Sequence, residues 1–310
     1  MSTDARTPLP GYAWFLIGLG GAVVGLLPWL VTGARLPLQN LAADQTTTDT
    51  PFALLPFSQY FLASIVALLV VGAAAAGIAG RTLADRRPRF GTTLLVGGLM
   101  VGQLLAAVQS SVVTIGMLEE STRTAVYAGA VIAVIVVSLL VSLLVVLLIA
   151  RAPVPGATIA LSMSAIVSAG WVGVALRDVM TYGPNELTQV LLTILRWMPA
   201  VLVGCAIAWC GFRSIGRVIA AVVSLLALWI GPAFFTAVSA AAGTRVLAPY
   251  PAEMAEYGVQ VFLMALTMPE LVIPPLIVAL VVGVVGSLLL ARRRTLRTRD
   301  ATEPSPALAD

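Results

Sequence analysis

The sequence predicts an all-α integral membrane protein, a polytopic bundle of eight transmembrane helices. Of its 310 residues, 59% are hydrophobic and 10% are charged, whereas soluble domains carry about 25% charged residues. The mean hydropathy is +1.00. Apolar stretches recur along the whole chain, and each can cross a hydrocarbon core of about 30 Å at about 1.5 Å per residue. A soluble bundle is disfavoured because its helices would need a polar face.

The spans are expected to follow one another from the N-terminus to the C-terminus. In chain order they cover residues 12–31, 60–80, 92–117, 124–150, 157–176, 191–211, 218–240 and 271–291. A short cytoplasmic leader, residues 1–11, precedes a first span that is too long for the apolar region of a cleavable signal peptide. Residues 292–310 form a basic tail, and its polar end, rich in small residues, is expected to be disordered.

The arginines predict how the spans are oriented. All 18 basic residues are arginines, and cytoplasmic connections carry an excess of basic residues. With both termini in the cytoplasm, the inside segments hold Arg6, Arg81, Arg86, Arg87, Arg89, Arg151, Arg213, Arg217, Arg292, Arg293, Arg294, Arg297 and Arg299, and the outside holds Arg35, Arg123, Arg177, Arg196 and Arg245. We therefore expect a multi-pass protein of a bacterial cell (cytoplasmic) membrane. The net charge of +4 serves this orientation, so the lipid bilayer is the expected partner and nucleic acid is not.

A further helix is predicted between the seventh and eighth spans. Pro251 followed by Glu253 and Glu256 is typical of a helix start, but the apolar stretch after it, residues 257–268, is too short to cross. This helix of about 17 residues would lie in the outer interface as a cap, or re-enter the membrane. In transporters, substrate sites are often formed where a half-helix is followed by a broken helix.

Small residues at four-residue spacing predict close helix packing. They are Gly21 and Gly25 in the first span, Gly72, Ala76 and Gly80 in the second, Gly98 and Gly102 in the third, and Ala160, Ser164 and Ser168 in the fifth. Packing within the bundle and a dimer face are both compatible with this pattern. Cys205 and Cys210 point about 140° apart on a helix, so no disulfide is expected between them.

The third span carries a polar stripe. Gln103, Ser110 and Thr114 fall on one helical face, and Gln109 lies close by. A glutamine in lipid needs a hydrogen-bond partner, so this face should look into the bundle. The stripe is either part of a polar path or pocket, or it holds helices together.

Arg196 and Glu270 are two ionisable residues near the ends of apolar runs. Arg196 lies about 26 Å of helix from Arg213, and Glu270 about 33 Å from Arg292. Both are thus expected near the outer edge, Arg196 snorkelling or lining a polar cavity and Glu270 as a boundary acid. At one depth they could form an ion pair, which exchanging the two charges would restore.

The absent residue types exclude several chemistries. Without histidine there is no bis-histidine haem, histidine zinc site or Ser–His–Asp triad, and without lysine there is no Walker A motif. No catalytic site, metal or cofactor is predicted. Any ATP hydrolysis would need a separate ATPase.

Two functional classes are compatible with the sequence. The first is a permease-like or transport-associated membrane component, and the second is a non-catalytic scaffold or accessory subunit bound to other membrane subunits of a cell-envelope complex. A continuous cleft lined by Gln103, Ser110 and Arg196 would favour transport. A solid bundle with an exposed groove of small residues would favour the scaffold.

Overall fold

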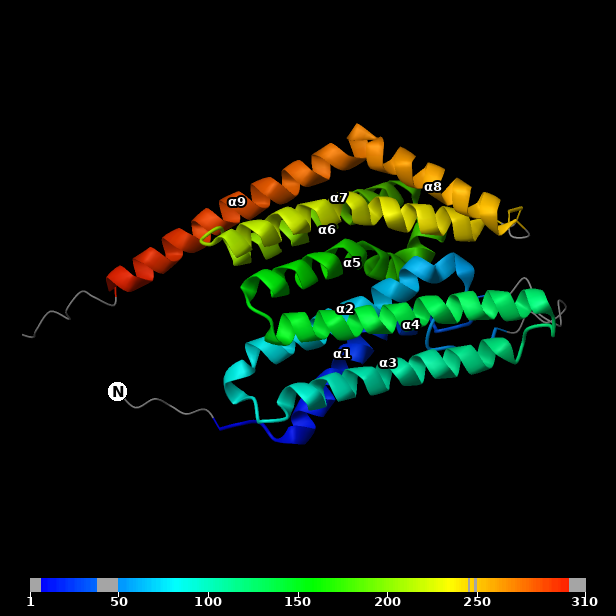
Figure 1. Cartoon of the computed structure of the whole chain (residues 1–310), viewed down its shortest axis with the longest axis horizontal. Coiled ribbons are helices and arrows are strands. Elements are labelled where there is room, and N and C mark those ends of the chain that lie inside the picture. The colour runs from blue at the N-terminus through cyan, green and yellow to red at the C-terminus, as the bar shows by residue number, and fades with distance from the viewer. Residues whose placement is uncertain (1–6, 38–49, 245, 248–249, 301–310) are drawn as a thin grey trace, which may run out of the picture.

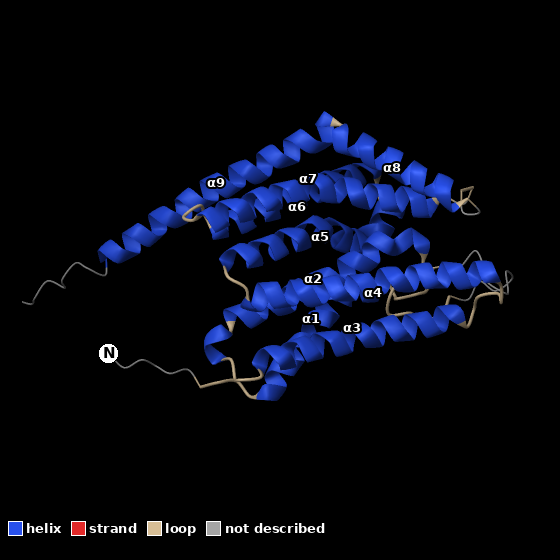
Figure 2. Cartoon of the chain, in the orientation of Figure 1, coloured by secondary structure: helices blue, strands red, loops and turns tan. Residues whose placement is uncertain are grey.

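The computed structural model describes residues 7–37, 50–244, 246–247 and 250–300, with side chains as far as Arg293. The described parts are helical and contain no strand (Figure 2). The helices are α1 (Gly11–Val31), α2 (Leu62–Thr82), α3 (Gly91–Ile115), α4 (Thr122–Arg151), α5 (Val154–Tyr182), α6 (Asn185–Cys210), α7 (Ile215–Gly243), α8 (Pro251–Thr267) and α9 (Pro269–Asp300), with 3-10 turns η1 (Gln59–Phe61) and η2 (Ala84–Arg86). Arg6, Asp44, Asp49, Arg245 and the tail end from residue 301 lie outside the described residues.

Eight of the described helices, α1 to α7 and α9, are long and apolar enough to cross a membrane. The chain is therefore a multi-pass helical membrane protein, as predicted. Each expected span falls on one of these helices. The helices α5 and α6 extend further than expected toward each other, to Tyr182 and from Asn185, because hydropathy detects only the apolar part of a helix. A turn at Gly183 and Pro184 then separates them.

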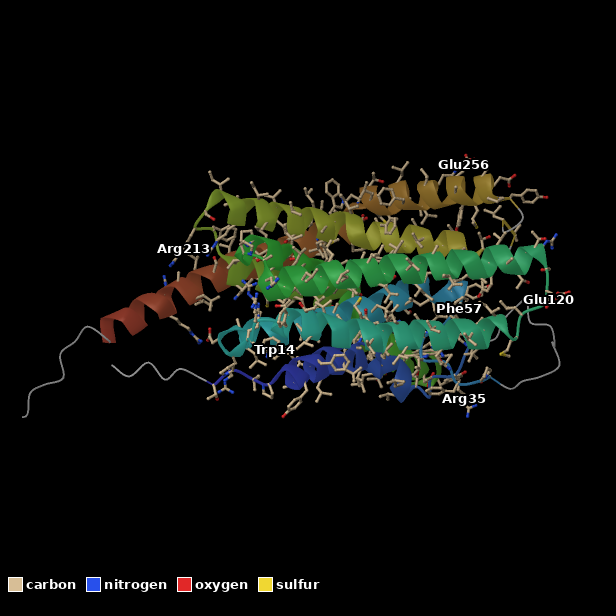
Figure 3. All side chains as sticks on the ribbon, turned by 60° about the horizontal axis from the view of Figure 1, so that its bottom comes forward. Trp14, Arg35, Phe57, Glu120, Arg213 and Glu256 are labelled. Atoms are coloured by element: carbon tan, nitrogen blue, oxygen red, sulfur yellow. The ribbon has the colours of Figure 1, made fainter. Side chains whose placement is uncertain are left out.

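The long helices run side by side along the molecule (Figure 1). Arg213 lies at one end of the bundle, and Glu120 and Glu256 lie at the other (Figure 3). We call the first the basic end, defined by Arg81, Arg87, Arg151, Arg213 and Arg217, and the second the opposite end. The start of α1 and the described end of α9 both lie at the basic end (Figure 1).

The helices α1 and α3, and α1 and α2, approach each other closely through glycines. A Cβ atom added at Gly72 would come within 2.7 Å of the Gly21 carbonyl oxygen, and one added at Gly102 within 2.6 Å of the Ala22 Cβ. A Cβ at Gly98 would overlap the carbonyl oxygen of Phe15. Backbones can approach this closely only where no side chain intervenes, so these glycines are packing residues within the chain.

The other residues expected to pack helices lie at internal contacts as well. Ala76, Ala160 and Ser164 are buried, and a Cβ at Gly80 would come within 2.6 Å of Leu95 Cδ2. Ser168 is half-buried, and its hydroxyl donates to the Ala165 carbonyl of its own helix at 2.6 Å.

The helices α8 and α9 bury few of their side chains. α8 has no buried residue and packs against α7, and α9 lies along α6. Among the described side chains of α9, Ala279 and Gly283 are the buried ones. α8 and α9 meet at an angle about halfway along the bundle (Figure 1).

Candidate functional site

An extended segment, residues 51–58, is inserted into the bundle at the opposite end. Ala53, Leu55 and Phe57 are fully buried although the segment is not helical. Irregular backbone inside a membrane protein needs partners for its polar groups. The Ala53 N–H donates to the Ala34 carbonyl at 2.8 Å, and Trp29 Nε1 donates to the Ala53 carbonyl at 2.7 Å.

The polar residues of α3 supply most of the remaining partners of this segment. Gln109 Nε2 donates to the Phe52 carbonyl at 2.9 Å, and its Oε1 accepts from the Leu54 N–H at 2.9 Å. Ser110 Oγ accepts from the Leu55 N–H at 2.7 Å. The side chains of Gln109 and Ser110 therefore hold an inserted backbone rather than facing open space.

The other two residues of the stripe are also buried. Gln103 is 1% exposed, and its Nε2 donates to the Leu69 carbonyl of α2 at 2.7 Å, whereas its Oε1 has no partner. Thr114 donates to the Ser110 carbonyl of its own helix at 2.8 Å. Gln103 thus joins α3 to α2, and the Thr114 bond lies within α3.

The second feature is the interruption between α8 and α9. In a regular helix the N–H of residue 274 would donate to the Glu270 carbonyl. Pro274 has no N–H, so the Glu270 carbonyl lacks this intrahelical hydrogen bond. Arg196 of α6 replaces that donor: its Nη2 donates to the Glu270 carbonyl oxygen at 2.9 Å. In the last turn of α8, where carbonyls also lack helical partners, Trp229 Nε1 of α7 donates to the Leu266 carbonyl at 3.0 Å.

The position of this interruption differs from the one expected for Glu270. Arg196 lies about 17 Å from the start of α6 and about 21 Å from its end, and Trp229 is midway along α7. Glu270 therefore lies near the middle of the bundle rather than at its opposite end. The cause is α8, which packs on α7 in the half of the bundle nearer the opposite end, so that α9 begins halfway along the bundle (Figure 1).

Arg196 and Glu270 are neighbours, but their contact is not the expected ion pair. The guanidinium reaches the main chain of Glu270, and no ion pair joins it to the carboxylate. Both residues are exposed on the bundle surface, and the Arg196 guanidinium lies over the Trp197 ring at 5.6 Å. The bond thus depends on the shape of the broken helix rather than on the charge of Glu270.

Exchanging the two charges is expected not to restore the contact. Arg196→Glu should lower the unfolding temperature of the purified protein, because the Glu270 carbonyl loses a charged donor worth about 1.5–3 kcal/mol. Glu270→Gln should change stability by less than about 1 kcal/mol, the size of a helix-terminus charge effect. The double variant Arg196→Glu, Glu270→Arg should be no more stable than Arg196→Glu. A double variant close to the wild type would show that the carboxylate is the true partner.

The residues proposed for one polar path lie in two places. Gln103, Gln109, Ser110 and Thr114 belong to the packed helices α1 to α4, whereas Arg196 and Glu270 join α6 to α9. The inserted segment and Trp229 were not found from the sequence. Two prolines around a short apolar run, "PFALLPF" at residues 51–57, were the available signal for the segment.

Cysteine and metal chemistry add nothing to this site. Cys205 and Cys210 are both free thiols, the first exposed and the second buried. In the part of the chain that the structure describes, no three His, Cys, Asp or Glu residues gather where they could hold a metal ion.

The chain matches no family model, no curated protein and no solved structure.

Proposed function

We propose that this chain is a permease-like membrane component of a transport assembly in a bacterial cell membrane. Both termini face the cytoplasm, the cargo is lipophilic or weakly polar, and any ATP hydrolysis comes from a separate ATPase chain. The observation that carries this proposal is the interruption between α8 and α9 halfway along the bundle. In this proposal α8 re-enters the membrane from outside.

The interruption has the features of a substrate site in a broken helix. It places two helix ends and an arginine at the same depth, and broken helices in transporters present backbone ends to their cargo. Arg196 uses one of its N–H groups on Glu270, and the guanidinium has five. The remaining donors are available to a cargo with an acceptor oxygen.

The helix α8 is also the part of the bundle most suited to move. None of its residues is buried, and regions with few buried contacts open at low free energy. The bonds of the interruption to Arg196 and Trp229 are single contacts that can break and re-form. The packed helices α1 to α4 would act as the static body.

The packing of α1 to α5 favours the alternative function, a non-catalytic scaffold or accessory subunit. Gln103 and Ser110 have 1% and 0% exposure, so they do not share a cleft with Arg196. The small residues that were expected to pack helices, such as Gly72 and Gly98, are however in contact inside the chain, so they offer no exposed groove to a scaffold's partner.

Cysteine accessibility distinguishes these functions. In a background of Cys205→Ser and Cys210→Ser, we expect Thr267→Cys, beside the interruption, to react with a membrane-impermeant maleimide added from either face of the membrane. Reaction from both faces is the signature of alternating access. The matched control is Ile194→Cys, which is exposed at nearly the depth of Arg196 and should stay unlabelled in lipid.

The result that contradicts transport is equally specific. If Thr267→Cys is labelled from one face alone or from neither, the interruption does not alternate between compartments. The scaffold function is then favoured.

A further inference from the structure

Three arginines converge at one corner of the basic end. Arg81 lies in the last turn of α2, Arg151 ends α4, and Arg87 lies in the connection from α2 to α3. Arg81 Nη1 donates to the Ile149 and Ala152 carbonyls, each at 2.9 Å. Arg87 Nη2 donates to the Gly80 carbonyl at 2.7 Å and to the Ala150 carbonyl at 3.0 Å. These guanidiniums therefore cap the C-terminal ends of α2 and α4, where carbonyls lack helical partners.

The positive charge of this corner has no counter-ion among the described residues. All the partners above are neutral carbonyls, and no ion pair links Arg81, Arg87 or Arg151 to a described carboxylate. Burial lowers the pKa of the Arg87 guanidinium, and the charges of Arg151 and Arg81 lower it further. The three like charges repel one another, so a bound anion would relieve that repulsion.

Unused hydrogen-bond donors accompany this charge. Arg151 is exposed and makes no side-chain hydrogen bond to the described residues. Arg87 Nε is covered and has no acceptor, and neither does Nε1 of the fully buried Trp14, whose ring lies 5.6 Å from the Arg87 guanidinium. A phosphate group, with several acceptor oxygens, suits a cluster of guanidinium donors.

Apolar surface borders the same corner. The Arg81 guanidinium lies 5.0 Å from the centre of the Trp209 ring of α6, and Trp209 is 37% exposed. Ile78, one helical turn before Arg81 on α2, is 46% exposed. A charged cluster at the end of the spans with apolar side chains toward the membrane has the layout of a lipid: headgroup at the surface and acyl chains along the helices.

We propose that the corner formed by Arg81, Arg87, Arg151 and Trp209 binds the phosphate headgroup of an anionic phospholipid in the leaflet at the basic end. Arg151 and the free donors of Arg81 contact the phosphate, and the acyl chains lie against Ile78 and Trp209. This site is independent of transport, because it involves neither α8 nor α9.

Arg151 separates lipid binding from helix capping. The side chains of Arg81 and Arg87 donate hydrogen bonds to main-chain carbonyls, so substituting either arginine would weaken the fold whether or not a lipid binds. Arg151 donates to no described carbonyl, so Arg151→Gln removes charge from the corner with the caps left in place. Arg293→Gln is the matched control, because Arg293 is an exposed arginine at the end of α9, which extends away from this corner (Figure 1).

The test is native mass spectrometry of the full-length protein titrated with dioleoylphosphatidylglycerol or with zwitterionic dioleoylphosphatidylethanolamine. We expect tighter binding of the anionic lipid. Arg151→Gln should weaken it about five-fold, the effect of one basic residue near an anionic surface. Arg151→Lys should retain most of the affinity, and Arg293→Gln should leave it unchanged.

Three results would overturn the proposal. The first is equal binding of the two lipids, and the second is equal losses in Arg151→Gln and Arg293→Gln. The third is displacement of the lipid by equimolar glycerol phosphate, which would show a site for free anions. Thermal unfolding of each variant, measured in parallel, confirms that the compared proteins are folded.

Discussion

Gly98→Leu is expected to prevent α1 and α3 from packing and to leave little folded protein. A Cβ at this position would overlap the Phe15 carbonyl oxygen and lie 3.0 Å from the Leu19 nitrogen. These are backbone atoms of α1, so no side-chain rotation can relieve the overlap. Gly18 makes the reciprocal approach, since a Cβ there would overlap the Leu95 carbonyl oxygen. We expect a loss of about 3 kcal/mol or more, at the upper end of overpacking effects.

Gly97→Leu is the matched control for this prediction. Gly97 precedes Gly98 on the same helix, and a Cβ there would have no heavy atom within 4 Å. The measurement is the yield of monodisperse protein after detergent extraction, followed by its unfolding temperature from tryptophan fluorescence. Gly97→Leu should match the wild type. Equal losses in the two variants would mean that these helices do not meet through Gly98.

Gln109→Leu is expected to release the inserted segment at residues 51–58. The substitution removes both the donor to the Phe52 carbonyl and the acceptor for the Leu54 N–H. Each lost hydrogen bond is worth about 0.5–1.5 kcal/mol, and Gln109 makes two such bonds with this segment. The segment should therefore detach locally before the bundle unfolds.

Detachment can be measured with a thiol placed in the segment. Ala53 is fully buried, so Ala53→Cys should react with a maleimide only slowly, and Gln109→Leu should accelerate the reaction at least about ten-fold, which corresponds to about 1.4 kcal/mol. The control is Ser111→Ala, because Ser111 bonds to the Ala107 carbonyl of its own helix at 2.8 Å. If both substitutions accelerate labelling equally, the segment is not held through Gln109.

The polar stripe of α3 shows how far a pattern in the sequence leads. Helical periodicity places Gln103, Ser110 and Thr114 on one face, and all three are buried. The periodicity does not identify their hydrogen-bond partners, because the backbone that Gln109 and Ser110 bind belongs to a connection far away in the chain. A polar path and a structural clamp need the same side chains on the same face.

The interruption between α8 and α9 shows that the sequence pattern also does not give the depth of a residue, here Glu270, in the bundle. Pro251 and the prolines after Glu270 mark where the helices begin and bend, and the structure has α8 at Pro251–Thr267. Counting residues along a straight last span placed Glu270 at the outer edge. Its position near the middle of the bundle follows from the packing of α8 on α7 and from Arg196, and neither is a local property.

The sequence by itself determined that this protein is helical, crosses the membrane several times and carries most of its arginines in its two terminal segments and in alternate connections. Those properties depend on how each segment partitions between water and lipid, which local composition decides. Only the tertiary structure decided that residues 51–58 fill the opposite end, that α9 begins halfway along the bundle, and that Arg81 and Arg87 cap two helices. Those contacts join residues far apart in the chain, and they form because backbone groups buried away from water must find partners wherever the fold brings them.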